Sequence, residues 1–265
     1  MTRVSLVIVA ALSLGCASDP YVETPQGVFV PTQAVLVDLS HTLEPSMPTY
    51  DGAGFAVVAP PEGDASKWRD FTCSLFTGTR IKAPSYLVAG QLTVERLNPG
   101  SLVGPIVLID VTKEVLTDPD HRVTSREIQK WADRNGELPP GAIVIMRSGW
   151  SARWGKTDLD GRDLYLNADA RGVTHFPGFD AETVKVLMRS RISAIGTDTA
   201  SVEGGGAPGA NAVYQGLMSS GRYALENLHG LERVPDQGAT LFVSPLKVGA
   251  APAAPARVTA LVPRT

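Results

Sequence analysis

The sequence has little of what disulfide-rich, nucleic-acid-binding and membrane-spanning proteins need. Only 2 of its 265 residues are cysteine, too few for a disulfide framework or a thiolate zinc site. Its 24 basic and 27 acidic side chains give a net charge of −3 without a long basic run. No nucleic-acid partner is therefore expected. No apolar run reaches the roughly 20 residues that a membrane-spanning helix requires.

What the chain does contain is typical of a folded domain. Apolar residues make up 43% of it and charged residues 19%, so it is long enough and apolar enough to bury a sizeable core. Its 26 glycines and 20 prolines favour short strands joined by many turns over a helix bundle.

The first residues have the pattern of a targeting signal. Arg3 precedes an apolar run over 4–15 that ends in small residues, which is the order of an export signal; a buried N-terminal strand is the alternative. Two processing routes stay open: lipid attachment to Cys16 after cleavage at Gly15, or ordinary cleavage after Ala17. The stretch resembles a bacterial lipobox, although Ser13 stands where a large aliphatic residue is typical. We predict a lipid-anchored protein of the bacterial cell envelope, with a soluble periplasmic or secreted protein as the alternative.

This interpretation divides the chain into an export signal over 1–16, a proline-containing linker over 17–33 and a folded domain over 34–265. Contact with a membrane is expected only through the lipid anchor. Within the domain, short β-branched runs predict buried strands over 34–39, 104–111, 142–146, 192–195, 240–243 and 257–262. Helices are predicted after the caps Thr124, Asp180 and Asn211. Strands thus alternate irregularly with fewer helices, which indicates an α/β domain.

The segment 76–86, Phe-Thr-Gly-Thr-Arg-Ile-Lys-Ala-Pro-Ser-Tyr, resembles the signature of the cyclase family that includes bacterial kynurenine formamidase. That signature is normally His-x-Gly-Thr-His-x-Asp-x-Pro-x-His, and Gly78, Thr79 and Pro84 are intact. Family-like stretches continue at 37–43, 176–178, 195–201, 225–228 and 245–247. The resemblance spans nearly the whole domain and implies a swivelling β/β/α fold and a homo-oligomer.

The resemblance also implies where a metal ion would be held. Carried over to this chain, the family's ligand positions are Phe76, Arg80, Lys82, Tyr214 and Glu226. Tyr86 stands at the histidine that handles protons. Glu226 alone keeps its type, whereas zinc and manganese need imidazole, thiolate or carboxylate donors. No cofactor is therefore predicted, and the ancestral zinc or manganese is expected to be absent.

The substitutions suggest an internal replacement for that metal. Arg80 and Lys82 can neutralise Glu226, and Tyr86 and Tyr214 add hydroxyl groups. With Phe76, such a pocket suits a small anionic or aromatic molecule, and His41 and His175 could also line it. The alternative is an ion-paired plug that preserves the fold without binding anything. An open cavity would favour binding or chemistry, and a filled one a scaffold.

Two catalytic hypotheses accompany this interpretation. Lys82 could act as a base or imine-forming amine with Tyr86 as general acid, provided that Glu226 pairs with Arg80 and leaves Lys82 unpaired. A Ser201–His175–Asp198 hydrolase is the other option, although no Gly-x-Ser-x-Gly elbow is present; Asp198 more simply fixes a turn. We therefore predict a pseudoenzyme that has lost metal-dependent hydrolysis. An arylformamidase-type amide or lactone hydrolase and a non-catalytic oligomeric scaffold are the alternatives.

Overall fold

The computed structural model describes residues 34–49, 54–58, 70–206 and 211–264. The expected export signal, its linker and Cys16 lie outside these residues. Within the described ranges, no helix has the length and hydrophobicity to cross a bilayer.

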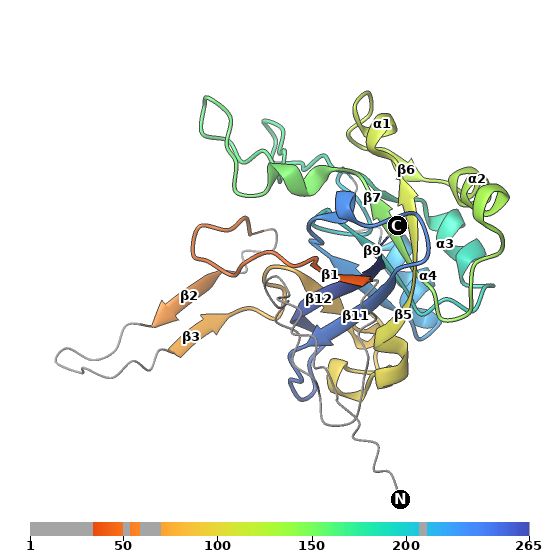
Figure 1. Ribbon diagram of the computed structural model, residues 1–265. Helices are drawn as coiled ribbons and strands as arrows, with labels where there is room; N and C mark the ends of the chain where they lie inside the picture. The colour runs from red at the N-terminus through yellow and green to blue at the C-terminus, as the bar shows by residue number, and fades with distance from the viewer. Residues whose placement is uncertain (1–33, 50–53, 59–69, 207–210, 265) are drawn as a thin grey trace, which may run out of the picture. The chain divides into compact units, whose positions relative to one another are not determined.

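A closed sheet forms the centre of the domain (Figure 1). Four of its strands are mutually parallel: β5 (Val103–Asp110), β7 (Ile143–Arg147), β9 (Ala194–Thr197) and β10 (Tyr223–Glu226). Three antiparallel strands complete the ring: β4 (Arg80–Lys82), β12 (Ala253–Pro263) and β11 (Thr240–Pro245). The pairing of β12 with β4 closes the barrel, and β1 (Ala34–Asp38) adds to β12 outside it.

Apolar side chains leave the strands toward two separate cores. In β5, Ile106 and Leu108 belong to one buried cluster together with Ile145 and Leu225, whereas the alternate Val107 belongs to the other. Because both faces of such strands are buried, they read as continuous apolar runs in the sequence. All six predicted strands are confirmed, as β1, β5, β7, β9, β11 and β12. Their ends lie within two residues of the predicted ends, except that β12 begins four residues before its predicted start.

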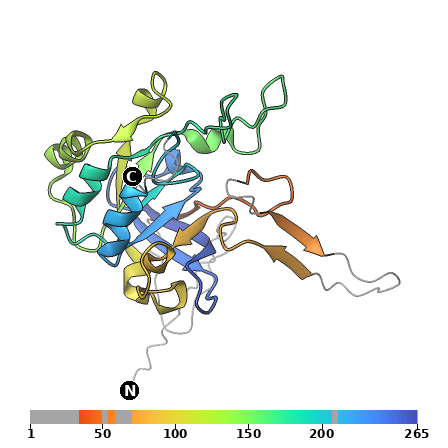
Figure 2. The same cartoon turned by 180° about the vertical axis from the view of Figure 1, so that it is seen from behind.

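Among the described residues, four α-helices accompany the sheet: α1 (Thr112–Val115), α2 (Ser125–Asn135), α3 (Ala181–Leu187) and α4 (Ala212–Ser219). Figures 1 and 2 show α2, α3 and α4 on the same side of the barrel, where they cover the second core. The predicted caps hold for two of them, since Glu127 Oε2 accepts from the Thr124 amide at 2.7 Å and Asp180 Oδ2 accepts from the Thr183 amide at 2.8 Å. Asn211 precedes α4 as predicted, but its side chain makes no capping hydrogen bond.

The remaining elements are short. β2 (Phe55–Val58) and β3 (Asp70–Cys73) form a two-stranded ribbon, and β6 (Arg122–Val123) pairs with β8 (Gly178–Phe179). The 3-10 helices are η1 (Pro84–Tyr86), η2 (Val94–Arg96), η3 (Pro99–Leu102), η4 (Trp150–Arg153) and η5 (Leu231–Arg233). The predicted α/β class is confirmed.

Candidate functional site

The candidate site is built on two neighbouring strands. Glu226 at the end of β10 lies directly opposite Arg80 in antiparallel β4, and Lys82 follows two residues later. Side chains two residues apart on a strand share a face. The strand register therefore places both cations on the side of the sheet where Glu226 points.

Each oxygen of the Glu226 carboxylate has its own partners. Oε2 receives Arg80 Nε at 2.9 Å and Nη2 at 2.8 Å, and it lies 3.2 Å from Lys82 Nζ. Oε1 accepts hydrogen bonds from the Tyr214 hydroxyl and, at 3.3 Å, from the Val202 amide. The carboxylate is thus surrounded by donors, as a buried charge must be if it is to remain ionised.

The two cations are anchored differently. Arg80 also donates to the carbonyl oxygens of Phe76, at 3.0 Å, and of Ala200. Lys82 Nζ donates to the Tyr214 hydroxyl at 2.9 Å and lies 4.5 Å from the centre of the Tyr86 ring. It is 4.8 Å and 5.7 Å from the ring centres of Tyr214 and Phe76. The ammonium group of Lys82 is therefore held by one carboxylate, one hydroxyl and three aromatic rings.

Burial decides the character of this cluster. Glu226 is fully buried, and Arg80, Lys82 and Tyr214 are each 2% exposed. Burial alone would raise the pKa of the Glu226 carboxyl, but Lys82 and Arg80 outweigh it and hold the pKa below its ordinary value. Burial, followed by the charge of Glu226, raises the pKa of Tyr214 well above its usual range. The cluster is a filled, ion-paired core with a protonated phenol.

This donor set does not fit a divalent metal ion. Phe76 has no donor atom, Arg80 and Lys82 bring positive charge, and Tyr214 keeps its proton; Glu226 is the one carboxylate. Zinc and manganese need several imidazole, thiolate or carboxylate ligands. In the part of the chain that the structure describes, no group of three or more His, Cys, Asp and Glu side chains is arranged to hold a metal.

The structure does not meet the condition attached to Lys82 as a catalytic base or imine-forming amine. That role required a lysine without an ion-pair partner, but Lys82 pairs with Glu226 and is 2% exposed. Tyr86, its expected partner acid, is half-buried, and its ring meets those of Phe76 and Tyr214 edge-on, with centres 5.5 and 5.3 Å apart. Ion pairing stabilises the charged amine, which is the form that cannot attack a carbonyl group.

The Ser201–His175–Asp198 alternative is also not assembled. Ser201 Oγ lies 2.8 Å from the Tyr214 hydroxyl, and His175 Nδ1 lies 2.6 Å from Asp120 Oδ2. Asp198 accepts from Ser148 Oγ at 2.6 Å and from the Trp150 amide at 3.1 Å, so it fixes the turn after β7 as predicted. The three side chains therefore serve three different networks, and His175 is not placed with the Glu226 cluster.

His41 occupies a different position from the cluster. Its ring stacks on Trp154, with centres 3.9 Å apart, and its backbone amide donates to Thr79 Oγ1 at 2.9 Å. Burial, with a smaller effect from His229, lowers the pKa of His41 to about 3. His41 is consequently neutral at physiological pH and lies beside Thr79, the residue before Arg80.

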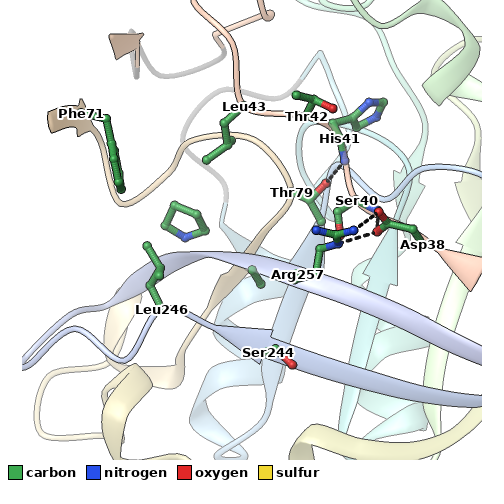
Figure 3. Close-up of a pocket in the computed structure, with 12 residues that line it drawn as sticks. Asp38, Ser40, His41, Thr42, Leu43, Phe71, Thr79, Ser244, Leu246 and Arg257 are labelled. Carbon is green, nitrogen blue, oxygen red and sulfur yellow. Dashed lines mark hydrogen bonds and ion pairs between the residues drawn. The ribbon is translucent and has the colours of Figure 1, made fainter. Parts of the chain in front are cut away.

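A cavity of about 450 Å³ opens next to this residue (Figure 3). Its walls come from the end of β1 and the segment after it, from β3, from Thr79 just before β4 and from the β11–β12 region: Asp38, Ser40, His41, Thr42, Leu43, Phe71, Thr79, Ser244, Leu246, Pro255, Ala256 and Arg257. Sequence reasoning named only His41 among them as a lining residue, because separate regions of the chain supply the walls. It also did not place the 200–202 segment against Arg80 and Glu226, although the family-like stretch 195–201 overlaps that segment.

Comparison with known proteins agrees with this fold. A family model described as "Putative cyclase" matches residues 37–204. An isatin hydrolase of Roseibium aggregatum is 29% identical over 210 residues, which cover 77% of this chain and 78% of that protein. The solved isatin hydrolase A from Labrenzia aggregata, bound to benzyl benzoate, is 31% identical with a TM-score of 0.77, over 87% of this chain and 94% of that chain. Isatin hydrolase A from Ralstonia solanacearum is 29% identical with a TM-score of 0.77, over 86% of this chain and 92% of that chain.

Proposed function

The chain belongs to the cyclase family, and from that premise we propose that it is an exported member that binds a small anionic or aromatic molecule and no longer performs metal-dependent hydrolysis. One observation carries the proposal. Arg80, Lys82 and the Tyr214 hydroxyl surround the Glu226 carboxylate at positions where the family resemblance implies metal ligands.

The proposed loss of hydrolysis follows from the chemistry of this cluster. A metal-dependent hydrolase lowers the pKa of a bound water toward ~7 and so makes hydroxide available at neutral pH. Here two cations and a protonated phenol already satisfy the carboxylate, and the surrounding side chains leave no more than 2% of each of these groups exposed. To activate a water molecule at this place, the protein would need metal-ligating side chains and an unfilled space beside them.

The proposed ligand site is the cavity beside Thr79, because the ion-paired cluster itself is filled. Its volume of about 450 Å³ falls within the roughly 300–1,000 Å³ typical of small-molecule sites. Its walls combine aromatic and aliphatic side chains, which bind apolar parts of a ligand, with polar and charged side chains that can orient it. In this proposal, the Glu226 cluster has a structural role and the neighbouring cavity beside Thr79 binds the ligand.

The test of lost hydrolysis is a turnover assay with isatin and N-formylkynurenine, run with added Zn²⁺ or Mn²⁺ and again with a chelator. We expect background rates in both cases. The Roseibium isatin hydrolase serves as the positive control with isatin. Robust hydrolysis that the chelator abolishes would overturn the proposal, and His41 and His175 would then be the first side chains to replace.

A second candidate function, a subunit of a homo-oligomeric scaffold, is favoured by exposed apolar strands. β1 is the terminal strand of the sheet and exposes Leu36 by 50%, and Val57 on β2 is 52% exposed. Exposed apolar edge strands tend to pair with another chain. Sedimentation of the mature protein and of Leu36→Lys tests this candidate: a stable oligomer that the substitution dissociates supports it, and a monomeric wild-type protein removes it.

A further inference from the structure

The cavity beside Thr79 has a charged end and an apolar end. Figure 3 shows Asp38 paired with Arg257 at one end, and Phe71, Leu43 and Leu246 gathered at the other. Phe71 is 54% exposed and Leu246 46% exposed. Large apolar side chains that stay this accessible beside a cavity provide surface that a ligand can cover.

The charged end is carried by two paired strands of the sheet. Asp38 is the last residue of β1 and Arg257 lies within β12, the strand with which β1 pairs. Arg257 Nε and Nη2 contact the two oxygens of Asp38 at 3.0 and 2.7 Å, and the Ser40 amide donates to the same carboxylate at 3.1 Å. The strand pairing therefore places the two opposite charges side by side at this end of the cavity.

Both charged groups keep hydrogen-bonding capacity beyond this ion pair. A guanidinium has five N–H donors, of which these contacts use two, and a carboxylate has about four acceptor sites, of which they use three. The side chain of Arg257 is 69% exposed and that of Asp38 43%. Both groups can consequently accept a further partner without breaking their own ion pair.

The charge balance of the walls selects the kind of ligand. Among the lining residues, Asp38 and Arg257 carry opposite formal charges, and His41 is neutral because its pKa lies at about 3. A simple anion would meet Arg257 together with the repulsion of Asp38, and a simple cation the reverse. A zwitterion can place its carboxylate on Arg257 and its ammonium group on Asp38.

We infer that this cavity binds a free α-amino acid with an apolar or aromatic side chain. The carboxylate and ammonium groups contact the Asp38–Arg257 pair, while the side chain lies against Phe71, Leu43 and Leu246. This inference rests on the proposed binding function and narrows its ligand class, because an aromatic amino acid is a particular small aromatic molecule that bears an anionic group.

Titration calorimetry with L-phenylalanine, 3-phenylpropionate and 2-phenylethylamine tests the inference on the mature protein. The last two compounds keep the ring but lack the ammonium or the carboxylate group, respectively. We expect L-phenylalanine to bind at least about tenfold more tightly than either, since each omitted group leaves one wall charge without its partner.

Variants locate the binding. Arg257→Gln, Asp38→Asn and Phe71→Ala should each weaken L-phenylalanine binding at least about tenfold. Arg162→Gln is the matched control, because Arg162 is 72% exposed and lies 3.6 Å from Asp160 in another surface ion pair; it should leave binding unchanged. Binding that survives all three cavity substitutions would overturn the inference.

The outcomes also separate this inference from the proposed function. If 3-phenylpropionate binds as tightly as L-phenylalanine and is lost in Arg257→Gln, the amino-acid inference fails while an anionic-ligand function stands. If none of the three compounds binds, the inference is wrong and the cavity loses its support as the ligand site. Chelator-sensitive hydrolysis would refute the proposed loss of catalysis whatever the calorimetry shows.

Discussion

Replacing Glu226 with glutamine tests the ion-paired cluster directly. The substitution keeps the size of the side chain but removes its charge, so Arg80 and Lys82 lose the carboxylate that neutralises both. The new amide nitrogen is itself a donor and would face either these cations or the Tyr214 hydroxyl and the Val202 amide. None of these groups can turn to water, because Glu226 is fully buried and both cations are 2% exposed.

The expected loss of stability is large on the scale of a single domain. Removing one partner of a buried ion pair typically costs about 3–5 kcal/mol. The whole free energy of unfolding of a domain is about 5–15 kcal/mol. For a domain of this size, each kcal/mol shifts the melting temperature by about 2–4 °C. We therefore expect Glu226→Gln to melt roughly 6–20 °C below the wild-type protein in calorimetry or circular dichroism.

Glu182→Gln is the matched control for this experiment. Glu182 pairs with Lys185 at 2.6 Å, but their side chains are 76% and 59% exposed, and such pairs contribute at most about 1 kcal/mol. Should Glu226→Gln melt no lower than this control, the cluster would be solvated and the reasoning refuted.

The pH dependence provides an independent test. Since the folded-state pKa of Glu226 lies below its ordinary value, its contribution to stability is complete above the unfolded pKa and is lost as the pH falls through the folded one. The difference in stability between wild type and Glu226→Gln should therefore narrow below about pH 4.5. A difference that stays constant down to pH 2 would contradict an ionised Glu226.

Three further predictions concern other parts of the chain. Elemental analysis of the mature protein should find no stoichiometric zinc or manganese, and about one tightly held ion per chain would refute this. Cys16→Ser should release the protein from the membrane fraction, because a diacylated N-terminus anchors stably; a soluble wild-type protein starting at Ser18 would indicate cleavage after Ala17. In an NMR titration, the imidazole of His41 should stay neutral until about pH 3, since burial lowers its pKa. The pKa of His175 should lie above its ordinary value because of the hydrogen bond to Asp120. Overlapping titration midpoints for the two histidines would contradict the structure.

The pattern of kept and replaced signature residues has a structural explanation. Gly78 adopts a φ of 60°, which favours glycine, and Pro84 begins η1. Thr79 Oγ1 donates to the Asn227 carbonyl at 2.6 Å and accepts from the His41 amide. These three residues shape the backbone, whereas Phe76, Arg80, Lys82 and Tyr86 replace family side chains. The fold could therefore persist through the replacement of its ligand positions.

The sequence by itself determined six of the strands, three helices and the composition of the cluster, but not β4 and β10, the strands that carry the cluster. Short β-branched runs bounded by Gly and Pro located the strands, because local backbone preference and burial on both faces act on neighbouring residues. Charge balance paired Arg80 and Lys82 with Glu226, the carboxylate left at the family's ligand positions. The family resemblance supplied the long-range connection between these two segments.

Tertiary structure decided what no local pattern records. Whether the Arg80–Glu226 cluster was open or filled depended on how the Ala200–Val202 segment and α4 close over it, and these come from more than 100 residues further along the chain than β4. The joining of Asp38, Phe71 and Arg257 around one cavity depended on the pairing of β1 with β12 and on the position of the β2–β3 ribbon. Burial and charge proximity are properties of assembled strands, so they become fixed when distant segments pack together.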